Sequence, residues 1–395
     1  MIAQPESFER LPHYIGRDEA KNLLVQYAAQ ITSHPECIAL YFEGQGGLGK
    51  TRLLQLAPTI LYQSEKTKPI PFCCAELLDF YKFENRDPLV IEQRLIEGLK
   101  QPPDGASLWY RLPAEDVDRA FASYQAAYHH YQQAQESQNT EIIEQERARL
   151  RTTFIDGWNI FSQQRPMVIA FDTLETLFFR SPPDALINRT DTAAPLDALP
   201  EVLRITAGVD LVIQWMEQVL PQLQHTLVLC SGRPIRDGTN TLVDRLRELR
   251  LLRESVYRLT PFTTHTDIQD YLRAYIGERV DAEDIDLYYV QQITDGRPLL
   301  LTCYAETRRA ADALPPGLPA ATPDVCTSRA DFEDWLIATL LNPLTAAQVC
   351  GSKRSPIAST FWCMRDAVFA KTSCRPSLNV KTYPVTLRPL TSLHR

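Results

Sequence analysis

Short apolar runs, each followed by polar or glycine-rich positions, recur along the first 310 residues. Three of them, Cys37–Phe42, Met167–Phe171 and Thr226–Cys230, are typical of strands that are buried on both faces of a parallel sheet. Two further strands are expected, one ending near Asp79 and one within SVYRLTPF, residues 255–262. Stretches with helical spacing separate these runs. The alternation predicts an α/β fold, a doubly wound parallel sheet flanked by helices.

A long helical insertion is expected between the second and third strands, at about residues 113–161. Its first helix, Pro113 to Gln138, carries apolar residues spaced 4-3-4-3, namely Val117, Phe121, Tyr124, Tyr128 and Tyr131. Its second helix, from about Glu141 to Phe161, carries a similar apolar series. We expect a helical hairpin that packs against the sheet; an exposed hairpin that binds a partner is the alternative. The helix that follows the first strand is expected to end at Pro58, because proline breaks helices.

The sequence GQGGLGKT, Gly44 to Thr51, fits the G-x-x-x-x-G-K-[ST] pattern of a phosphate-binding P-loop. Its glycines allow successive backbone N–H groups to point into a concave nest for phosphate oxygens. Lys50 is expected between the β- and γ-phosphates, and the Thr51 hydroxyl is expected on Mg²⁺. The following helix adds the positive end of its dipole. The predicted nucleotide-binding residues of this segment are Gly44, Gln45, Gly46, Gly47, Leu48, Gly49, Lys50, Thr51 and Arg52.

Polar side chains follow two of the other predicted strands, where a parallel sheet brings strand ends to one edge. Asp172 is expected to hold Mg²⁺ together with Thr51, or it could be an aspartate that caps the loop. Glu175 could polarise the attacking water, or it could equally cap the following turn. Arg233 could reach the γ-phosphate, since guanidinium matches phosphate oxygens, or it could be a surface arginine at a strand end. Lys50, Asp172, Glu175 and Arg233 are therefore the candidate catalytic residues.

Composition narrows the classes of partner. With a net charge of −8, the chain is not expected to coat nucleic acid or anionic membranes. No stretch approaches the roughly 20 apolar residues of a membrane helix, and the N-terminus does not read as a signal peptide. The nine cysteines lack metal-ligand spacing and predict reduced thiols in the cytoplasm.

The C-terminal part differs from the rest of the chain in composition and charge. Residues 313–324 read as a linker, and residues 325–350 as the start of a possible further helical domain. Residues 351–395 hold eight lysines or arginines and one acid, a net charge of +7, with no helical or strand period. This predicts a basic, poorly ordered tail, which is the one part expected to attract nucleic acid. A second explanation, which we prefer, is that a domain or the reading frame is interrupted near Cys350.

Taken in order, five stretches resemble the STAND class of P-loop ATPases, which contains the NACHT and NB-ARC modules. They are YIGRDEAKNLL before the P-loop, GQGGLGKT itself, VIAFDTLE as the Walker B strand, LVLCSGR as the sensor strand, and YRLTPFTTHTDIQDYLRAYIG followed by ITDGRPLLLTCYA as the last strand, the helical lid and the G-x-P motif. Together they cover roughly residues 10–310. The resemblance implies an ATPase domain over residues 1–262 and a lid over residues 263–312.

Roles for several residues follow from this resemblance. It implies that Pro298 lies beside the adenine, that Gly16 and Arg17 line the base and ribose, and that Arg233 senses the γ-phosphate. The chain departs from the class in the offset of Glu175 from Asp172. We also find neither the winged-helix domain nor the repeats that usually follow, so the chain is expected to be a C-terminally truncated member.

The expected function is a molecular switch that binds ATP or ADP with Mg²⁺ and hydrolyses ATP slowly. By class resemblance it would act in signalling, regulation or defence, with an unknown protein partner or by self-assembly. The alternatives are a nucleotide-binding scaffold without turnover and, less favoured, a P-loop phosphotransferase, for which the sequence offers no acceptor site.

Overall fold

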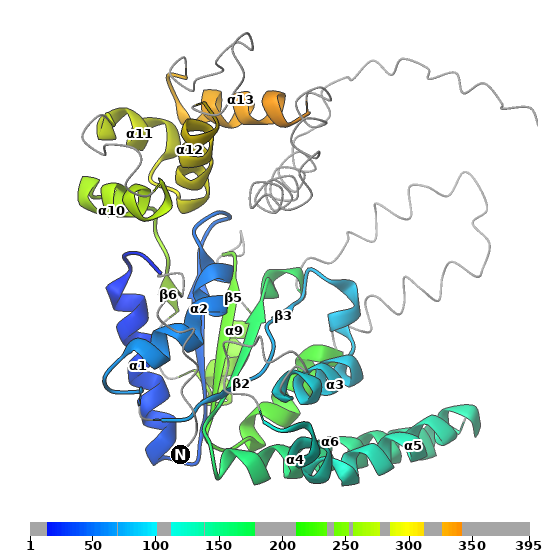
Figure 1. The fold of residues 1–395 in the computed structure, drawn as a ribbon. Helices are drawn as coiled ribbons and strands as arrows, with labels where there is room; N and C mark the ends of the chain where they lie inside the picture. Colours follow the sequence, from blue (N-terminus) through cyan, green and yellow to red (C-terminus); the bar gives the residue numbers. More distant parts are fainter. Residues whose placement is uncertain are drawn as a thin grey trace, which may run out of the picture. The chain divides into compact units, whose positions relative to one another are not determined.

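Figure 1 shows the chain in a computed structural model, which contains a parallel β-sheet. The structure describes residues 14–68, 70–100, 112–137, 139–177, 211–234, 241–252, 256–276, 285–311 and 326–341. The chain divides into two compact units, Met1–Ala313 and Leu314–Arg395. The domain boundaries predicted from the sequence stay predictions, and the linker at 313–324 and the tail at 351–395 lie outside the described residues.

The sheet lies in the first unit, and its described strands all pair in parallel. The spatial order is β2-β4-β5-β1-β6, and β3 also pairs with β4. This confirms the predicted doubly wound fold of a P-loop NTPase. The strands are β1 (Cys37–Glu43), β2 (Cys73–Cys74), β3 (Leu78–Asp79), β4 (Met167–Asp172), β5 (Thr226–Gly232) and β6 (Tyr257–Arg258).

Alternation along each strand divides the apolar core into two layers. Ile38, Leu40 and Phe42 of β1 face the layer that contains α1 (Asp18–Ser33) and α2 (Lys50–Gln63). The intervening residues of β1 face a second layer, which contains α3 (Pro88–Leu99), the hairpin helices and α9 (Thr241–Glu248). Helices therefore cover both faces of the sheet, and β1 is buried along its whole length.

The prediction that Pro58 ends the helix after β1 is wrong, because α2 continues through it to Gln63. Pro58 is partly exposed, while the residues on either side of it are buried. Apolar residues on both sides of the proline, such as Leu54 and Leu61, belong to the same core layer. Packing of this stripe against the sheet therefore outweighs the hydrogen bond that proline removes.

The strand expected to end near Asp79 is two short strands rather than one. Cys74 of β2 pairs with Val168, whereas Leu78 of β3 pairs with Phe171. The segment between them thus has one residue more than the matching stretch of β4. An extra residue of this kind interrupts a ladder in the manner of a β-bulge. The end at Asp79 is as predicted.

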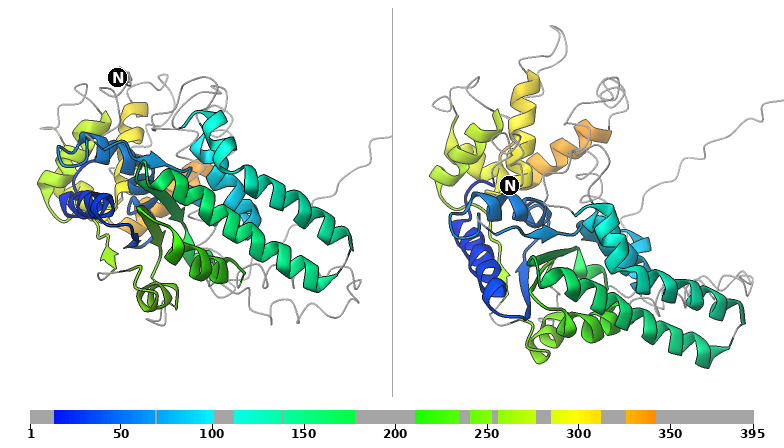
Figure 2. Two further views of the ribbon diagram at one scale, coloured as in Figure 1. Left: turned by 90° about the horizontal axis from the view of Figure 1, so that it is seen from below. Right: turned by 60° about the horizontal axis from the view of Figure 1, so that its bottom comes forward.

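The predicted helical hairpin is present and packs against the sheet. Its helices are α4 (Ala114–Ala120), α5 (Ala122–Ser137) and α6 (Thr140–Ser162), so the first predicted helix is broken at Phe121. Buried aromatic residues of α5 and α6 join the same core layer as Phe171 of β4. The far ends of α5 and α6 extend side by side beyond the sheet (Figure 2).

Three helices after β6 form the predicted lid, α10 (His265–Ile276), α11 (Leu287–Thr294) and α12 (Pro298–Ala311), and they pack on one another. The Tyr271 hydroxyl of α10 is 2.8 Å from the Thr302 hydroxyl of α12. In the second unit, the structure describes α13 (Arg329–Leu341). None of the helices in the described residues combines the length and apolar character needed to cross a membrane.

Candidate nucleotide-binding site

The glycine-rich loop connects the end of β1 to the start of α2. Gly47 and Gly49 have φ angles of 80° and 87°, in the left-handed region that glycine adopts without strain. Gly49 is the residue immediately before α2, so the loop delivers the chain into a helix of 14 residues. The N–H groups at the start of such a helix lack partners within it and favour a bound anion.

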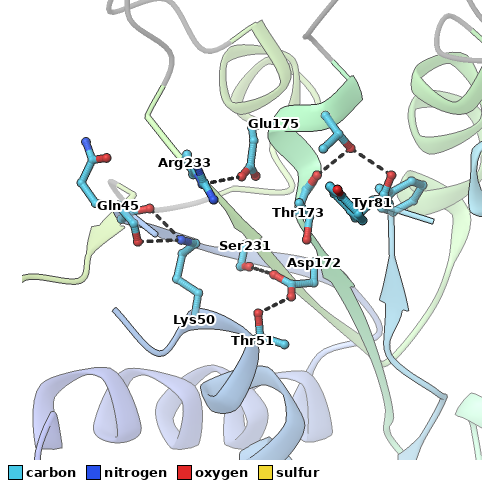
Figure 3. Close-up of polar contacts among 12 residues, drawn as sticks. Gln45, Lys50, Thr51, Tyr81, Asp172, Thr173, Glu175, Ser231 and Arg233 are labelled. Carbon is cyan, nitrogen blue, oxygen red and sulfur yellow. Dashed lines mark hydrogen bonds and ion pairs between the residues drawn. The ribbon is translucent and has the colours of Figure 1, made fainter. Parts of the chain in front are cut away.

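Lys50, the first residue of α2, points back across the loop. Its ammonium donates hydrogen bonds to the carbonyl oxygens of Gly44, at 2.7 Å, and of Gln45, at 3.0 Å (Figure 3). Lys50 is 9% exposed. Burial lowers the pKa of its ammonium, and the nearby Glu175 and Asp172 carboxylates oppose that shift. The lysine is thus held over the loop with two carboxylates in its electrostatic surroundings.

Asp172, the last residue of β4, receives hydroxyl groups from two other elements. The Thr51 hydroxyl donates to Oδ2 at 2.5 Å, and the Ser231 hydroxyl donates to Oδ1. The ends of β4 and β5 are neighbours in the sheet, and α2 begins beside them. Asp172 is 2% exposed. The structure therefore brings Thr51 and Asp172, the two predicted metal ligands, into direct contact.

Glu175 and Arg233 form an ion pair at the same edge of the sheet, with 3.3 Å between Arg233 Nε and Glu175 Oε1. Glu175 lies in a short 3-10 helix, Leu174–Leu177, and is 5% exposed. Burial raises the pKa of its carboxyl group, and among the described residues its Oε2 has no hydrogen-bond donor. The Arg233 guanidinium also lies against the P-loop, since a Cβ placed on Gly46 would be 3.2 Å from it.

The segment before α1 closes a second side of the loop. Gly16 and Arg17 both have left-handed backbones, with φ angles of 64° and 56°. The Arg17 guanidinium lies 5.0 Å from the centre of the Phe262 ring, in cation–π geometry. The Tyr14 hydroxyl donates to the carbonyl oxygen of Gly49 at 3.3 Å. Burial raises the pKa of Tyr14 to about 12.

The lid reaches the P-loop through the first turn of α12. Pro298 is buried and opens this helix, where a missing N–H is tolerated. The next residue, Leu299, donates its backbone N–H to the Gly47 carbonyl at 3.1 Å. Its side chain also lies against Gly47, because a Cβ there would be 3.0 Å from the Leu299 Cβ. The G-x-P motif is thereby placed at the loop.

The remaining predicted residues of the loop differ in how deeply they are buried. The Leu48 side chain is buried in the core layer that contains α1 and α2. Gln45 and Arg52 are exposed. The nucleotide-binding, catalytic and metal-binding roles given to all these residues stay predictions.

Four residues at the site received no role from the sequence: Tyr14, Ser231, Thr173 and Leu299. Ser231 stands at the end of a predicted strand, and the strand-end argument that selected Asp172 could have selected it. Thr173 follows Asp172 directly and has a φ angle of 60°. A positive φ at a β-branched residue leaves no signature in the sequence.

No family model matches the chain, and no curated protein matches it. Solved structures that it resembles include the Aeropyrum pernix ORC2 protein in its ADP form, with 11% identity, a TM-score of 0.42, and coverage of 95% of this chain and 85% of that chain. The ADPNP–ADP complexes of the same protein give the same identity and TM-score, with 95% and 86% covered. Drosophila ORC bound to DNA is 14% identical, with a TM-score of 0.38 and coverage of 93% and 77%. Likeness of this degree leaves the function to be argued from the residues.

Proposed function

We propose that this protein is an adenine-nucleotide-dependent molecular switch with slow, Mg²⁺-dependent ATP hydrolysis. The observation that carries the proposal is the contact between the Thr51 hydroxyl and Asp172. A glycine-rich turn with a purely structural role has no need of a threonine directed at a buried carboxylate on a neighbouring strand. A P-loop NTPase does, because its metal ion is held between these two groups.

The residues present fit both the metal ion and the nucleotide. Hydroxyl and carboxylate oxygens are the hard ligands that Mg²⁺ prefers, and Mg²⁺ sites often use one carboxylate together with substrate phosphates. The left-handed glycines, the start of α2 and Lys50 together form an anion cradle. Thr51 and Asp172 would hold Mg²⁺, and Lys50 and the loop amides would hold the phosphates. Bound Mg²⁺–ATP supplies the phosphoryl group and a cation that offsets its charge.

Four side chains then have distinct tasks. With a nucleotide bound, Lys50 would exchange its bonds to the loop carbonyls for bonds to phosphate oxygens. Ser231 keeps one oxygen of Asp172 occupied, so that the other faces Thr51. Glu175, whose carboxyl pKa is raised by burial, is suited to accept a proton from water. Arg233 lies between Glu175 and the P-loop, where a guanidinium can detect an added phosphate.

The lid supplies the element that a switch requires. The Leu299–Gly47 contact joins the first turn of α12 to the phosphate-binding loop. A nucleotide can shift the lid only through contacts that differ between its di- and triphosphate forms. Lys50 and Arg233 are the residues placed to make that difference. We assign the base side to Arg17, Gly16 and Pro298.

The cellular role that we propose for this switch rests on the STAND resemblance. We propose a role in signalling, regulation or defence, exerted through a protein partner or self-assembly. The six described cysteines are buried and form no disulfide with one another, which supports a reducing compartment such as the cytoplasm. We assign attraction of nucleic acid to the basic tail alone.

A second candidate, a nucleotide-binding scaffold without turnover, is favoured by one observation. Glu175 is paired with Arg233 rather than directed at a free approach for water. If this pair persists with nucleotide bound, the candidate base stays engaged and the protein retains its ligand.

Substitution of the P-loop lysine tests the proposal. In Lys50→Ala, phosphate release from ATP should fall by roughly 100-fold or more, because a positioned cationic donor is lost. The matched control is Lys100→Ala, since Lys100 forms ion pairs with Glu97 and Asp118 on the surface. Phosphate release and calorimetric binding of ADP and ATP should be measured on both variants and on the parent.

The outcomes separate the two candidates. Turnover in the parent and in Lys100→Ala, together with its loss in Lys50→Ala, supports the ATPase switch. Tight binding of ADP and ATP without phosphate release in the parent supports the scaffold. Absence of any binding heat from the folded parent protein would rule out both candidate functions.

A further inference from the structure

The chain makes a strained turn between the two acidic residues of the site. Thr173, directly after Asp172, has a φ angle of 60°. This is an unfavourable region for a β-branched residue, and such strain persists where surrounding contacts enforce it. The turn separates Asp172, at the end of β4, from Glu175, in the short helix that follows. Any contact that holds Thr173 in this conformation therefore also sets how these two carboxylates are placed.

Asp79 makes such a contact. The Thr173 hydroxyl donates to Asp79 Oδ1 at 2.7 Å, and Asp79 is the register partner of Asp172 in the β3–β4 pair. The same Oδ1 accepts the backbone N–H of Tyr81 at 2.9 Å, a local turn of the kind that aspartate often makes. The link to Thr173 spans 94 residues of sequence and so has no explanation in local turn geometry. Figure 3 shows Thr173 and Tyr81 on the side of Asp172 that is away from Lys50.

The chain around Asp79 braces the turn further. The backbone N–H of Phe80 donates to the Asp172 carbonyl at 3.0 Å. The Thr176 hydroxyl lies 3.0 Å from the Phe80 carbonyl and 2.8 Å from the Thr173 carbonyl. Asn85, which is buried, donates its side-chain amide to the Asp79 carbonyl at 2.7 Å. The segment after β3 thus contacts the turn on both sides of Thr173.

We propose that Asp79 is a positioning residue of this site, which acts through Thr173 to hold Asp172 and Glu175 toward the P-loop. The inference rests on the function proposed above. Asp172 is thereby kept at Thr51 and Glu175 at Arg233. Among the described contacts, the Asp79 side chain touches none of the predicted nucleotide-binding residues, so its effect on the site passes through the turn.

The test uses two single variants and their combination in the full chain. Asp79→Ala removes the acceptor, and Thr173→Val removes the donor while keeping the shape of the side chain. Asp79→Asn and Thr173→Ser retain an acceptor and a donor and serve as conservative variants. The matched control is Asp87→Ala, because Asp87 is an exposed aspartate that caps α3 by accepting the Leu89 N–H. Its loss removes a similar local hydrogen bond away from the turn.

Three quantities should be measured: kcat and KM for phosphate release, ATP affinity without Mg²⁺, and the Mg²⁺ concentration that half-saturates the increase in ATP affinity. Asp79→Ala and Thr173→Val should each lower kcat or raise the Mg²⁺ requirement by roughly 10- to 100-fold, as for other groups that orient metal ligands. ATP affinity without Mg²⁺ should stay within about 2-fold, and the double variant should match the single ones. Asp79→Asn, Thr173→Ser and Asp87→Ala should behave as the parent does.

Other results overturn the inference. A parental kcat and Mg²⁺ requirement in Asp79→Ala would do so, as would effects of the two substitutions that multiply in the double variant. If the parent binds ATP without turnover, the ATPase proposal fails, and the Mg²⁺ requirement alone decides whether Asp79 positions Asp172. An equal loss in Asp87→Ala would show general destabilisation and would also overturn the assignment.

Discussion

At the scale of single residues, the orientation of Asp172 depends on which hydroxyls reach it. β5 lies between β1 and β4, so its last residues are the ones beside the end of β4. Ser231 is completely buried there and donates to Oδ1. A hydrogen bond to a charged group contributes about 1.5–3 kcal/mol. The serine therefore fixes one carboxylate oxygen and leaves the other for Thr51.

Removing the Ser231 hydroxyl should weaken metal use more than nucleotide binding. In Ser231→Ala, we expect the Mg²⁺ concentration needed for half-maximal activity or ATP binding to rise by roughly 10- to 100-fold. The matched control is Thr226→Val at the other end of β5, where the hydroxyl accepts from Trp158 Nε1 and donates to the Gln224 carbonyl. That variant should lose stability and keep the parental Mg²⁺ requirement. The Mg²⁺ requirement of both variants should be measured in a Mg²⁺ titration, with phosphate release or nucleotide fluorescence as the signal. An equal rise of the Mg²⁺ requirement in both variants would refute the role of Ser231.

At the scale of elements, one buried carboxyl group joins three helical segments. Glu92 of α3 accepts hydrogen bonds from Tyr124 of α5, at 3.0 Å, and from Trp215 of the helical segment 211–219, at 2.8 Å. It is 1% exposed. Burial raises its pKa to about 7, although both hydrogen bonds and the more distant Arg151 act to lower it and Asp87 acts to raise it. The insertion is thus attached to the sheet domain through a group that titrates near neutrality.

The sign of the resulting pH dependence follows from this raised pKa. The folded state binds the Glu92 proton more tightly than the unfolded state, so Glu92 stabilises the fold most at low pH. Its contribution declines as the pH rises from about 4.5 to about 7, because ionisation then favours the unfolded chain. The total loss is on the order of 3 kcal/mol.

Glu92→Gln should remove most of this dependence, since an amide is uncharged and can still bond to Tyr124 and Trp215. We expect the variant to match the parent at pH 5 and to exceed its free energy of unfolding at pH 8. Glu97→Gln, on the exposed side of the same helix, should leave the parental pH profile unchanged. Denaturant unfolding at several pH values measures this, and parallel profiles for Glu92→Gln and the parent would contradict the prediction.

The elements also show which parts of the fold a sequence can specify. The buried runs of β1, β4 and β5 and the loop after β1 are contiguous signals, so the sheet edge with Lys50, Asp172 and Arg233 could be predicted. The end of α2 could not be predicted, because packing on both sides of Pro58 outweighs the tendency of proline to end a helix. The Asp79–Thr173 contact could not be predicted either, because it depends on a register between two strands and on a strained turn.

At the scale of the first unit, two backbone hydrogen bonds among the described residues join the lid to the sheet domain. Leu299 bonds to Gly47 of the P-loop. Gly296, with a φ angle of 60°, accepts the Phe262 N–H at 2.8 Å and packs directly against the Phe262 backbone. A side chain at Gly296 would collide with the Phe262 carbonyl. The Arg17 guanidinium lies over the Phe262 ring, so the segment before α1, the lid and the P-loop are linked through Phe262, Gly296 and Leu299.

Gly296→Ala should therefore uncouple the lid from nucleotide binding. We expect the affinity for ADP to fall by roughly 5- to 150-fold, the range typical of coupling between sites, because the lid can no longer dock while the P-loop stays intact. Asp286→Ala is the matched control, since it removes the cap of α11 within the lid and leaves the Gly296 contact unchanged. Calorimetric ADP binding, together with thermal unfolding of both variants, separates lid docking from lid stability. If Gly296→Ala binds ADP as the parent does, or if Asp286→Ala weakens binding equally, the lid does not hold the nucleotide through this contact.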